Sequence, residues 1–191
     1  MQRPEVNVFL AISLDGFIAD RDGQLGWLTP FGGDSPDDTG YTALMQRVDV
    51  LVMGRNTYET VLAFGEWPYV GKRVLVLSHR PLADARVEPF SGPIDALLAQ
   101  LCEQGCRAVY LDGGAVVRQA LQAALIDRMT LSWAPVLLGQ GKPLFGPELP
   151  MTNLDLLEHR LLPSGLLQCT YQPKERAPAP DAPAPAPTSG P

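Results

Sequence analysis

Three short clusters of glycine and polar residues follow apolar stretches, and their residue types suit an anionic ligand. Arginine supplies a planar cationic fork, glycine lets the backbone approach a ligand closely, and a helix N-terminus presents unpaired N–H groups. We therefore predict one site for an extended ligand that carries several negative charges. The clusters are Gly54-Arg55-Asn56-Thr57 with Thr57 as a cap of the next helix, Ser78-His79-Arg80, and Asp112-Gly113-Gly114-Ala115-Val116.

The common nucleotide-binding fingerprints are absent from the sequence. The first apolar stretch is not followed by G-x-G-x-x-G, and the chain contains no G-x-x-x-x-G-K-[ST]. The predicted site is therefore neither an ordinary Rossmann site nor a Walker site.

The elements that must position these clusters alternate between strand and helix. Helical periodicity over Tyr41–Val48, Ile94–Cys102 and Val117–Leu125 separates the apolar stretches, with Pro93 at a first helical position and Gly105 past that helix's end. Such alternation predicts a mainly parallel sheet with helices on both faces. Strands are expected at Val6–Leu14, Val48–Gly54, Arg73–Ser78, Ala108–Leu111 and Met129–Leu138.

The C-terminal part of the sequence predicts a different pairing. Leu156–Leu162 and Leu166–Gln172 flank the turn Pro163-Ser164-Gly165, which indicates an antiparallel hairpin. The predicted fold class is thus α/β with a mixed, mainly parallel central sheet. We expect one domain over residues 1–173 and a disordered tail rich in Pro and Ala over residues 174–191.

Charge and composition exclude several classes of partner. The net charge is −6 and the pI about 4.8, which argues against general binding of nucleic acid. Three cysteines without a Cys-x-x-Cys pair and only two histidines predict neither a structural metal nor a disulfide framework. No apolar run is long enough for a membrane span and the N-terminus lacks a secretory signal, so we expect a cytoplasmic protein.

The clusters occur in an order that resembles the dihydrofolate reductase-like superfamily. Within it, the sequence is most similar to the branch that contains the reductase domain of riboflavin biosynthesis proteins, as a stand-alone relative. The resemblance covers roughly residues 6 to 172, and the ordered set is more specific than any single motif. Its motifs are Ser13–Ala19, Gly54–Glu59, Val76–Arg80, Asp112–Gly114 and Ala134–Phe145.

This resemblance implies an NADPH-binding cleft and assigns a role to each motif. The backbone of Ala11 and Ile12 and the side chain of Ile18 would meet the nicotinamide, while Leu77 would contact the adenosine. Arg55 and Thr57 would hold phosphates, with Gly54 and Asn56 beside them. Ser78, His79 and Arg80 would bind the 2′-phosphate, and Gly113, Gly114, Ala115 and Val116 would run under the pyrophosphate and nicotinamide.

The residues themselves favour NADPH over NADH. A site for NADH usually places a carboxylate on the ribose diol, whereas a 2′-phosphate requires cations and hydroxyl groups. Ser78-His79-Arg80 supplies these groups. The expected activity is hydride transfer to a small heterocycle, above all a ribosylamino-pyrimidine.

Hydride transfer also requires a proton for the neighbouring heteroatom, and the sequence leaves its source open. Asp37 and Asp38 precede the Tyr41 helix and are our catalytic candidates, although acids at such positions are commonly helix caps. Asp15 and Trp27 are candidates for contacting the substrate. The alternative role of Asp15 is that of a turn residue, and the alternative role of Trp27 is packing in the core.

Two other functions fit the sequence. One is an authentic dihydrofolate reductase, which the absence of an acid at the usual spacing after Trp27 argues against. The other is an NADPH-binding protein without catalysis. The zinc deaminase signature H-x-E with P-C-x-x-C is absent, which argues against a bifunctional enzyme. A homodimer through Leu131–Leu138 is an option, but a central core strand explains the same residues.

Overall fold

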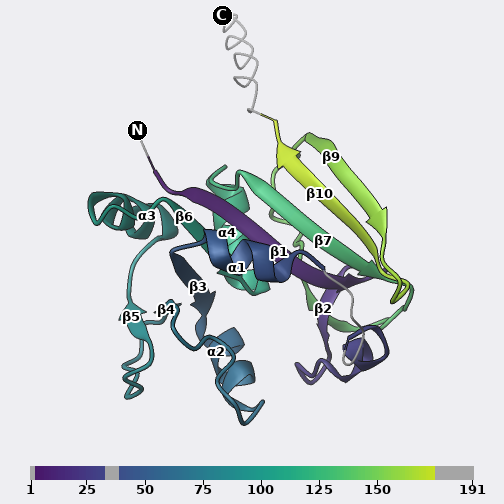
Figure 1. Cartoon of the computed structure of the whole chain (residues 1–191), viewed down its shortest axis with the longest axis horizontal. Coiled ribbons are helices and arrows are strands. Elements are labelled where there is room, and N and C mark those ends of the chain that lie inside the picture. The colour runs from purple at the N-terminus through teal and green to yellow at the C-terminus, as the bar shows by residue number, and fades with distance from the viewer. Residues whose placement is uncertain (1–2, 33–38, 175–191) are drawn as a thin grey trace, which may run out of the picture.

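A computed structural model describes residues 3–32 and 39–174 of the chain. Its centre is an eight-stranded sheet with the order β5-β4-β3-β6-β1-β7-β10-β9 (Figure 1). The strands from β5 to β7 are parallel, and β10 and β9 complete the sheet in antiparallel orientation. This arrangement confirms the predicted fold class.

The strands and helices follow the expected apolar patterns with small shifts at their ends. The strands of the sheet are β1 (Glu5–Ser13), β3 (Val50–Gly54), β4 (Arg73–Leu77), β5 (Glu88–Phe90), β6 (Ala108–Asp112), β7 (Arg128–Ala134), β9 (Leu154–Leu161) and β10 (Leu167–Pro173). The helices are α1 (Tyr41–Arg47), α2 (Arg55–Leu62), α3 (Ile94–Glu103) and α4 (Gly114–Gln122), with a 3₁₀ helix at Gly26–Phe31.

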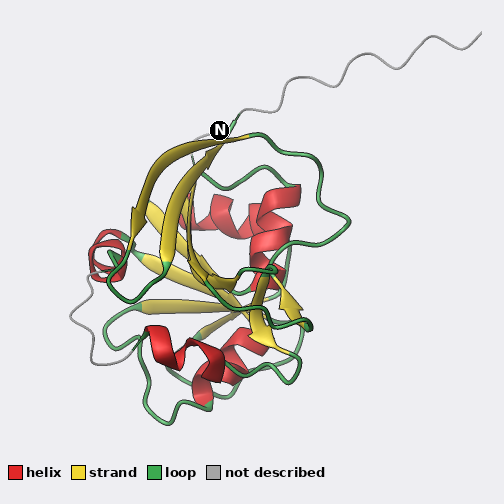
Figure 2. Ribbon diagram, turned by 90° about the vertical axis from the view of Figure 1, so that its right-hand side faces the viewer, coloured by secondary structure: helices red, strands yellow, loops and turns green. Residues whose placement is uncertain are grey.

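Helices cover both faces of the parallel strands (Figure 2). On one face, α3 and α4 contribute Leu97, Leu101 and Val117 to a core with β1, β3, β6 and β7. On the other face, α2 contributes Tyr58 and Val61, and α1 contributes Leu44. A buried parallel strand must be apolar on both sides, which is why the apolar runs of β3, β4 and β6 are nearly continuous.

Some predicted boundaries are wrong by a few residues. β7 ends at Ala134 and not at Leu138, because the chain turns there and the Val136 N–H donates to the Ala134 carbonyl at 2.8 Å. Leu131 and Ala134 are buried in the core, as the explanation of this run as a central strand predicts, whereas Leu137 is exposed. Pro93 is the N-cap of α3 and not its first residue.

A second, two-stranded sheet lies beyond the end of β1 and was not predicted. It consists of β2 (Phe17–Asp20) and β8 (Gly141–Pro143), which pair antiparallel across more than 120 residues of sequence. The Leu144 N–H also donates to the Gly16 carbonyl at 3.0 Å. These strands are too short to be recognised from local sequence.

The described residues contain neither a candidate membrane-spanning helix nor a candidate metal-binding cluster. None of the described helices is long and apolar enough to cross a membrane. No group of three His, Cys, Asp or Glu residues in residues 3–32 and 39–174 could hold a metal ion. The proposed tail falls outside the described residues from position 175 onward.

The junction of β6 and α4 depends on glycine, which generates a prediction. Gly113 has a φ of +92°, and a methyl group on it would overlap the Thr57 side chain. Gly105 has a similar φ of +79° with open space around it. We expect Gly105→Ala to lower the free energy of unfolding by about 1 kcal/mol through strain alone, and Gly113→Ala to cost at least about 2 kcal/mol because steric overlap adds to the strain. Urea denaturation of both variants measures the difference, and equal losses would contradict the crowding at Gly113.

Candidate functional site

The carboxyl ends of three adjacent strands bring the predicted clusters together. Gly54 at the end of β3 pairs with Leu77 at the end of β4, and Met53 pairs with Asp112 at the end of β6. Because β3 lies between β4 and β6, the residues after all three strands emerge side by side. The predicted convergence of the three clusters is confirmed. Both α2 and α4 begin at this edge, so their positive dipole ends point toward the same region.

Arg55 connects the first cluster to the second. It is the first residue of α2, and its Nη1 donates to the Ser78 Oγ at 3.0 Å and lies 3.4 Å from the Arg80 carbonyl oxygen. Its Nε donates to Glu59 on the next turn at 2.8 Å, which orients the guanidinium. The Arg80 N–H donates to the Ser78 Oγ at 3.1 Å, so the loop after β4 is held in a tight turn.

The side chains of His79 and Arg80 are exposed at the rim of this loop. The Nδ1 of His79 lies 3.1 Å from the Ser91 Oγ, just beyond β5. The backbone of Arg80 is held by Ser78, and its side chain is exposed. Leu77 is partly buried in the core beneath them, and Asn56 is exposed on the first turn of α2.

Thr57 does not cap α2 as predicted. The N-cap is Gly54 and has no side-chain hydrogen bond, because the helix begins directly at Arg55. Thr57 lies inside the first turn, and its side chain packs against Gly113 at the start of α4. Gly54 itself has an ordinary φ of −80°, so its conformation does not require glycine.

Gly114 lies where α4 meets the small sheet. A methyl group on Gly114 would lie 3.2 Å from the Ile18 Cδ1 of β2 and 3.1 Å from the Pro143 carbonyl oxygen of β8. Arg118 of α4 donates to that same oxygen at 2.6 Å. The predicted nicotinamide contact Ile18 and the predicted backbone contact Gly114 are therefore neighbours. The Val116 side chain is buried in the core, so only its backbone is available at the site, whereas Ala115 is exposed.

β1 and β6 separate at this end of the sheet. Their pairing ends at Val8↔Leu111, while β1 continues beside β7 as far as Ser13↔Ala134. The last five residues of β1 thus have no strand partner on the β6 side. Ala11 lies in this stretch and is partly exposed, whereas the Ile12 side chain is fully buried and leaves only its backbone for a ligand. A split in the sheet beyond the carboxyl ends of its strands is where open α/β sheets bind ligands.

Asp112, which the sequence pattern presents only as part of the glycine motif, is an acid at this split. Its position on β6 follows the last residue that pairs with β1. The Tyr69 hydroxyl, from the loop after α2, donates to its Oδ2 at 3.2 Å. Tyr41 and Tyr110 lie close by, with ring centroids 6.1 Å apart, and the Tyr110 hydroxyl donates to the Phe9 carbonyl of β1 at 2.9 Å. The signal in the sequence was a charged residue that ends a buried apolar strand.

The surroundings of Asp112 keep a proton on it at higher pH than usual. Burial raises the pKa of Asp112 to about 6, although hydrogen bonds from Tyr69 and the Gly113 N–H act in the opposite direction. Burial, with the nearby Asp112 charge, raises the pKa of Tyr41 to about 12, and the same causes raise the pKa of Tyr69. The tyrosines therefore remain protonated at neutral pH, whereas Asp112 can exchange a proton.

Asp15 occupies a structural position at the end of β1. Its Oδ1 accepts from the Ser13 hydroxyl at 2.6 Å and from the Leu138 N–H at 3.1 Å, and its Oδ2 accepts from the Gly139 N–H at 2.6 Å. The Ser13 bond and the two N–H bonds lower the pKa of Asp15, against a smaller effect of burial. Asp15 ties the turn after β1 to the loop after β7, which agrees with its alternative role as a turn residue.

Trp27 lies in the 3₁₀ helix beside Phe31 and packs against Ala134 and Leu166. Its indole nitrogen is buried and has no hydrogen-bond acceptor among the described residues. The ring is thus part of a small apolar cluster, with one donor unsatisfied. The catalytic candidates Asp37 and Asp38 lie outside the described residues.

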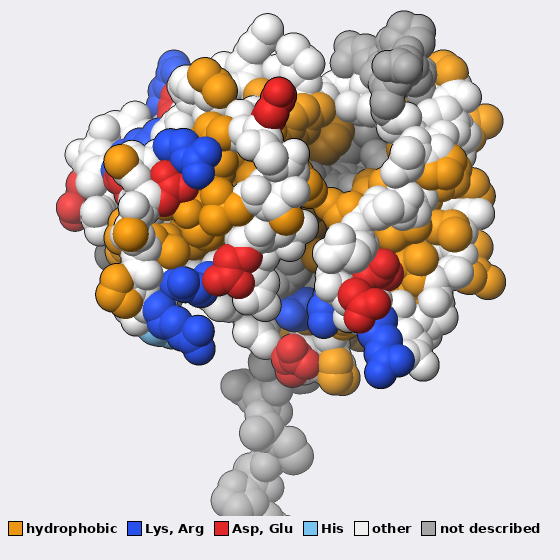
Figure 3. All heavy atoms as spheres, turned by 90° about the horizontal axis from the view of Figure 1, so that it is seen from below, with side chains coloured by type: hydrophobic (Ala, Val, Ile, Leu, Met, Phe, Trp, Pro, Cys, Tyr) orange, Lys and Arg blue, Asp and Glu red, His pale blue; other side chains and the backbone are white. Residues whose placement is uncertain are grey.

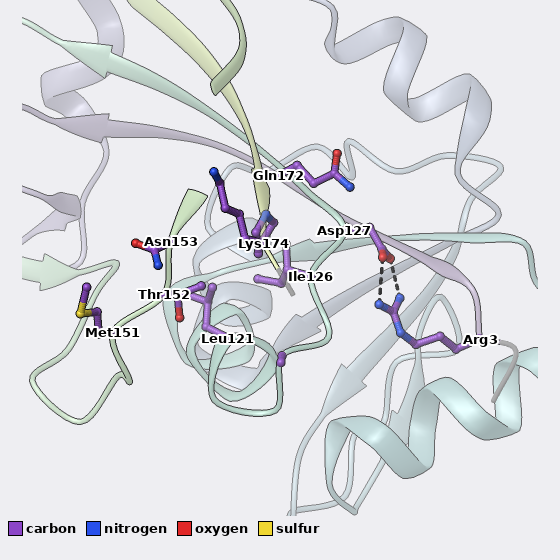
Figure 4. Close-up of a pocket in the computed structure, with 11 residues that line it drawn as sticks. Arg3, Leu121, Ile126, Asp127, Met151, Thr152, Asn153, Gln172 and Lys174 are labelled. Atoms are coloured by element: carbon purple, nitrogen blue, oxygen red, sulfur yellow. Dashed lines mark hydrogen bonds and ion pairs between the residues drawn. The ribbon is translucent and has the colours of Figure 1, made fainter. Parts of the chain in front are cut away.

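The end of the molecule toward which β3 points is seen in Figure 3. Basic and acidic side chains lie next to one another there, around apolar surface. The cavity of about 610 Å³ in Figure 4 lies elsewhere, where β1 begins and β10 ends, and includes Arg3, Asp127, Asn153 and Lys174. Arg3 and Asp127 pair across it, with Nη2 and Oδ1 2.9 Å apart. Because none of the predicted site residues lines it, this cavity is separate from the candidate site.

Comparisons with known proteins agree with this arrangement. The Bacillus subtilis protein YwjB is 35% identical over 149 residues, which cover 76% of this chain and 84% of YwjB. A crystal structure from Shewanella sp. PV-4, whose name connects it with riboflavin biosynthesis, superimposes with a TM-score of 0.84 at 39% identity and covers 90% of this chain and 99% of that one.

Longer relatives match over part of their length. The riboflavin biosynthesis protein RibD of Corynebacterium ammoniagenes is 28% identical over 171 residues, which cover 80% of this chain and 49% of that protein. The deaminase/5-amino-6-(5-phosphoribosylamino)uracil reductase of Thermotoga maritima shares the fold, with a TM-score of 0.64 at 16% identity over 90% of this chain and 57% of that one. The family model described as RibD C-terminal domain matches residues 4–168. This chain, with its split parallel sheet and its glycine-rich strand ends, belongs to the RibD C-terminal domain family.

Proposed function

We propose that this protein is an NADPH-dependent reductase that acts on a small heterocycle, above all a ribosylamino-pyrimidine. The observation that carries the proposal is the meeting of three strand ends beside the split between β1 and β6. Arg55, Ser78 and Arg80 lie at one end of this edge, and Ile18 and Gly114 lie at the other. A long ligand with separate anionic and planar parts suits such a site.

The residues at this edge fit the proposed cofactor. Gly113 and Gly114 let the start of α4 lie directly against Thr57, Ile18 and Pro143, and the first N–H groups of α4 are free of helical partners. Arg55 and the loop Ser78–Arg80 would hold the phosphate of the adenosine end. The backbone of Ala11 and the side chain of Ile18 would hold the nicotinamide end. When bound, NADPH supplies the hydride.

The loop after β4 favours the phosphorylated cofactor. Ser78, His79 and Arg80 offer a hydroxyl, an imidazole and a guanidinium, and Ser78 is already oriented by Arg55. The nearest acid in the following sequence, Asp84, is engaged by Arg86, with Nη2 and Oδ2 2.7 Å apart, and by the Tyr58 hydroxyl. A free carboxylate that would bind an unphosphorylated ribose is therefore lacking in the described part of this loop.

We assign the proton that accompanies the hydride to Asp112. Its carboxyl group lies at the split, and its raised pKa lets it carry a proton near neutral pH. Tyr69 orients the carboxyl through Oδ2, and Tyr41 and Tyr110 limit the access of water. In the balanced reaction, the acceptor carbon gains the hydride, the adjoining heteroatom gains the proton of Asp112, and solvent then reprotonates Asp112.

The choice of a pyrimidine over a pterin rests on the family. The chain belongs to the RibD C-terminal domain family and corresponds to about half of the Corynebacterium RibD. The zinc deaminase signature is absent from this sequence, so the deaminated substrate would come from a separate active site.

The cofactor assignment is tested by titration with NADPH and NADH. Loss of the Arg80 guanidinium should weaken NADPH binding by about 1.5 to 3 kcal/mol, the range for hydrogen bonds to charged groups, and barely change NADH binding. Fluorescence titration of Arg80→Ala, with the exposed Arg21→Ala as control, measures both. Equal losses for the two cofactors would contradict the 2′-phosphate site, and wild-type protein without affinity for millimolar NADPH would overturn the proposal.

The proton donor is tested by the pH dependence of turnover. With 5-amino-6-(5-phosphoribosylamino)uracil and NADPH, kcat should fall about tenfold per pH unit above pH 6, because Asp112 loses its proton there. Asp112→Asn should be slow at all pH values while still binding NADPH. The Tyr69 bond lowers the pKa of Asp112, so Tyr69→Phe should shift the falling limb to higher pH. Binding of NADPH without turnover of this pyrimidine or of dihydrofolate would favour a non-catalytic protein.

The same pKa predicts a pH-dependent effect on stability. The folded-state pKa of Asp112 lies above its ordinary 3.8, so ionised Asp112 destabilises the fold once the pH exceeds both values. The cost grows from pH 4 to pH 6 and reaches up to about 3 kcal/mol, at 1.36 kcal/mol per pKa unit. Calorimetry should therefore find that Asp112→Asn raises Tm relative to wild type at pH 7 more than at pH 4. The exposed Asp22→Asn is the control, and a pH-independent difference for Asp112→Asn would contradict the raised pKa.

A further inference from the structure

We propose that a groove between α1 and the antiparallel half of the sheet binds a phosphate group, either as free phosphate or as the phosphoryl group of a small molecule. The inference is independent of the proposed cofactor. It rests on the polar floor of the groove, on the three arginines that line it, and on the lack of a partner for one of them, Arg128, among the described residues.

The groove is separate from the candidate site. It has a volume of about 190 Å³, and none of the described residues that we assign to the cofactor or to the proton lines it. Phe9 of β1 lines the groove and packs against Tyr41 of α1, with ring centroids 5.7 Å apart, and Tyr41 packs in turn against Tyr110. These rings lie between the groove and Asp112. A groove of this volume has room for a small anion but is small compared with sites for whole cofactors.

The floor of the groove is a polar face of the sheet. Paired residues of neighbouring strands share a face, as do residues two apart along a strand. Apart from Phe9, this face presents only polar or charged side chains to the groove: Asn7 of β1, Arg128 and Thr130 of β7, Thr170 and Gln168 of β10, and Glu158 and Arg160 of β9. The opposite face buries Val8, Met129 and Leu131 in the core and carries the exposed leucines of β9, Leu154, Leu156 and Leu161. Buried sheet faces are normally apolar, so this polar face requires partners for its side chains.

Two of the arginines are held at the groove by amide side chains of the floor. In Figure 1, α1 lies over β1, and β7, β10 and β9 follow to the right of it. Arg47 reaches down from α1, and its Nη2 donates to the Asn7 Oδ1 at 2.9 Å. From β9, the Arg160 Nε donates to the Gln168 Oε1 at 2.9 Å. Both Asn7 and Gln168 are buried, so these bonds fix the positions of the two guanidinium groups.

Arg128, the third arginine, is partly buried at the start of β7. Its side chain makes no hydrogen bond or ion pair with residues 3–32 or 39–174. Among the described residues, the nearby acids are Glu158, which lines the groove without an ion pair to these arginines, and Glu5, whose Oε1 lies 3.9 Å from the Arg47 Nη2. A partly buried guanidinium without an acceptor is unfavourable, and a bound anion would remove this cost.

The balance of charge favours phosphate over a carboxylate. The guanidinium fork binds the oxygens of either group through paired hydrogen bonds. A phosphate monoester carries about 1.5 to 2 negative charges at neutral pH, whereas a carboxylate carries one. Three arginines face one lining acid in this groove, although the whole chain has a net charge of −6. This local excess of positive charge matches a phosphate group.

Titration of the full chain with inorganic phosphate tests the site. Calorimetry at constant ionic strength should detect saturable binding of phosphate, and chloride should give none. Arg128→Gln should weaken phosphate binding about tenfold or more, the loss expected for hydrogen bonds to a charged group. The exposed Arg21→Gln is the matched control and should bind as the wild type does. No binding at millimolar phosphate, or unchanged affinity of Arg128→Gln, would overturn the proposal.

A further variant separates the groove from the rim formed by Arg55, Ser78 and Arg80, where phosphate could also bind. Arg80→Ala should leave the affinity of the groove for phosphate unchanged. If Arg80→Ala abolishes the binding of phosphate and Arg128→Gln retains it, the phosphate belongs to the rim and the proposal is wrong.

The melting temperature distinguishes an arginine that binds a ligand from one that only supports the fold. Without phosphate, Arg128→Gln should have a Tm equal to or above that of the wild type, because the substitution removes an unpaired charge near two like charges. Saturating phosphate should raise the Tm of the wild type and leave that of Arg128→Gln unchanged. An equal loss of Tm in both buffers would indicate a purely structural arginine and contradict the site.

The source of the phosphate group is decided by comparing inorganic phosphate with glycerol 3-phosphate, with glycerol as the control. Tighter binding of the ester would identify a phosphorylated small molecule as the ligand, and tighter binding of inorganic phosphate would identify the free ion. In either case Arg128→Gln should lose the binding. An ester that binds Arg128→Gln as tightly as the wild type would show that it binds elsewhere and would overturn its assignment to the groove.

Discussion

The position of β6 between β3 and β1 is the constraint on which the rest of this structure depends. β6 is buried on both faces and hydrogen-bonded in parallel to both neighbours, so the end of β6 cannot move independently of the sheet. Pairing with β3 continues to Asp112, whereas pairing with β1 ends one residue earlier. This difference of one residue opens the split and directs Gly113 and Gly114 into it. Arg55, Thr57 and Ile18 acquire their positions by contact with elements that this arrangement holds in place.

The function that we propose combines two demands that conflict energetically. A ligand with several phosphates requires cations and free N–H groups, which the exposed rim formed by Arg55, Ser78 and Arg80 supplies. A proton donor that works near neutral pH requires the opposite environment, because burial must disfavour the carboxylate. The fold separates the two by placing the rim after β3 and β4 and the acid at the end of β6. The hydrogen bond from Tyr69 offsets part of the cost of burying Asp112, and its pKa stays raised because burial is the larger effect.

The antiparallel half of the sheet differs from the parallel half in that buried polar side chains pair between its strands. β7 and β10 share their buried polar residues Thr130, Thr170, Ser132 and Gln168 as hydrogen-bonded pairs, with 3.0 Å between the two threonine Oγ1 atoms and between Gln168 Nε2 and Ser132 Oγ. No helix is needed to complete these pairs. The hairpin can therefore extend beyond the helical layers, and β9 becomes an edge with an exposed leucine face.

Local sequence alone determined the elements with continuous apolar runs or clear helical periods. It also determined the order of the glycine and arginine clusters, because parallel strands joined by helices must place their carboxyl ends along one edge. The predicted end of a strand was wrong by a few residues where tertiary contacts determine the last residue of the strand, as at Ala134. The predicted cap at Thr57 was wrong because a helix that starts directly after a strand leaves no residue for a side-chain cap.

Only the tertiary structure revealed Asp112 as a buried acid at the proposed site. The sequence presented Asp37 and Asp38 as catalytic candidates because they precede a helix, and both lie outside the described residues. The pKa of an acid depends on what surrounds it in space, which local sequence does not report. Tyr69, Tyr41 and Tyr110 come from a loop, a helix and a strand, and together they bury Asp112 and so raise its pKa. The small sheet of β2 and β8 was also undetectable, because its strands are a few residues long and far apart in sequence. Sequence patterns report local periodicity, whereas burial, strand pairing across the chain and proton affinity arise only when distant segments meet.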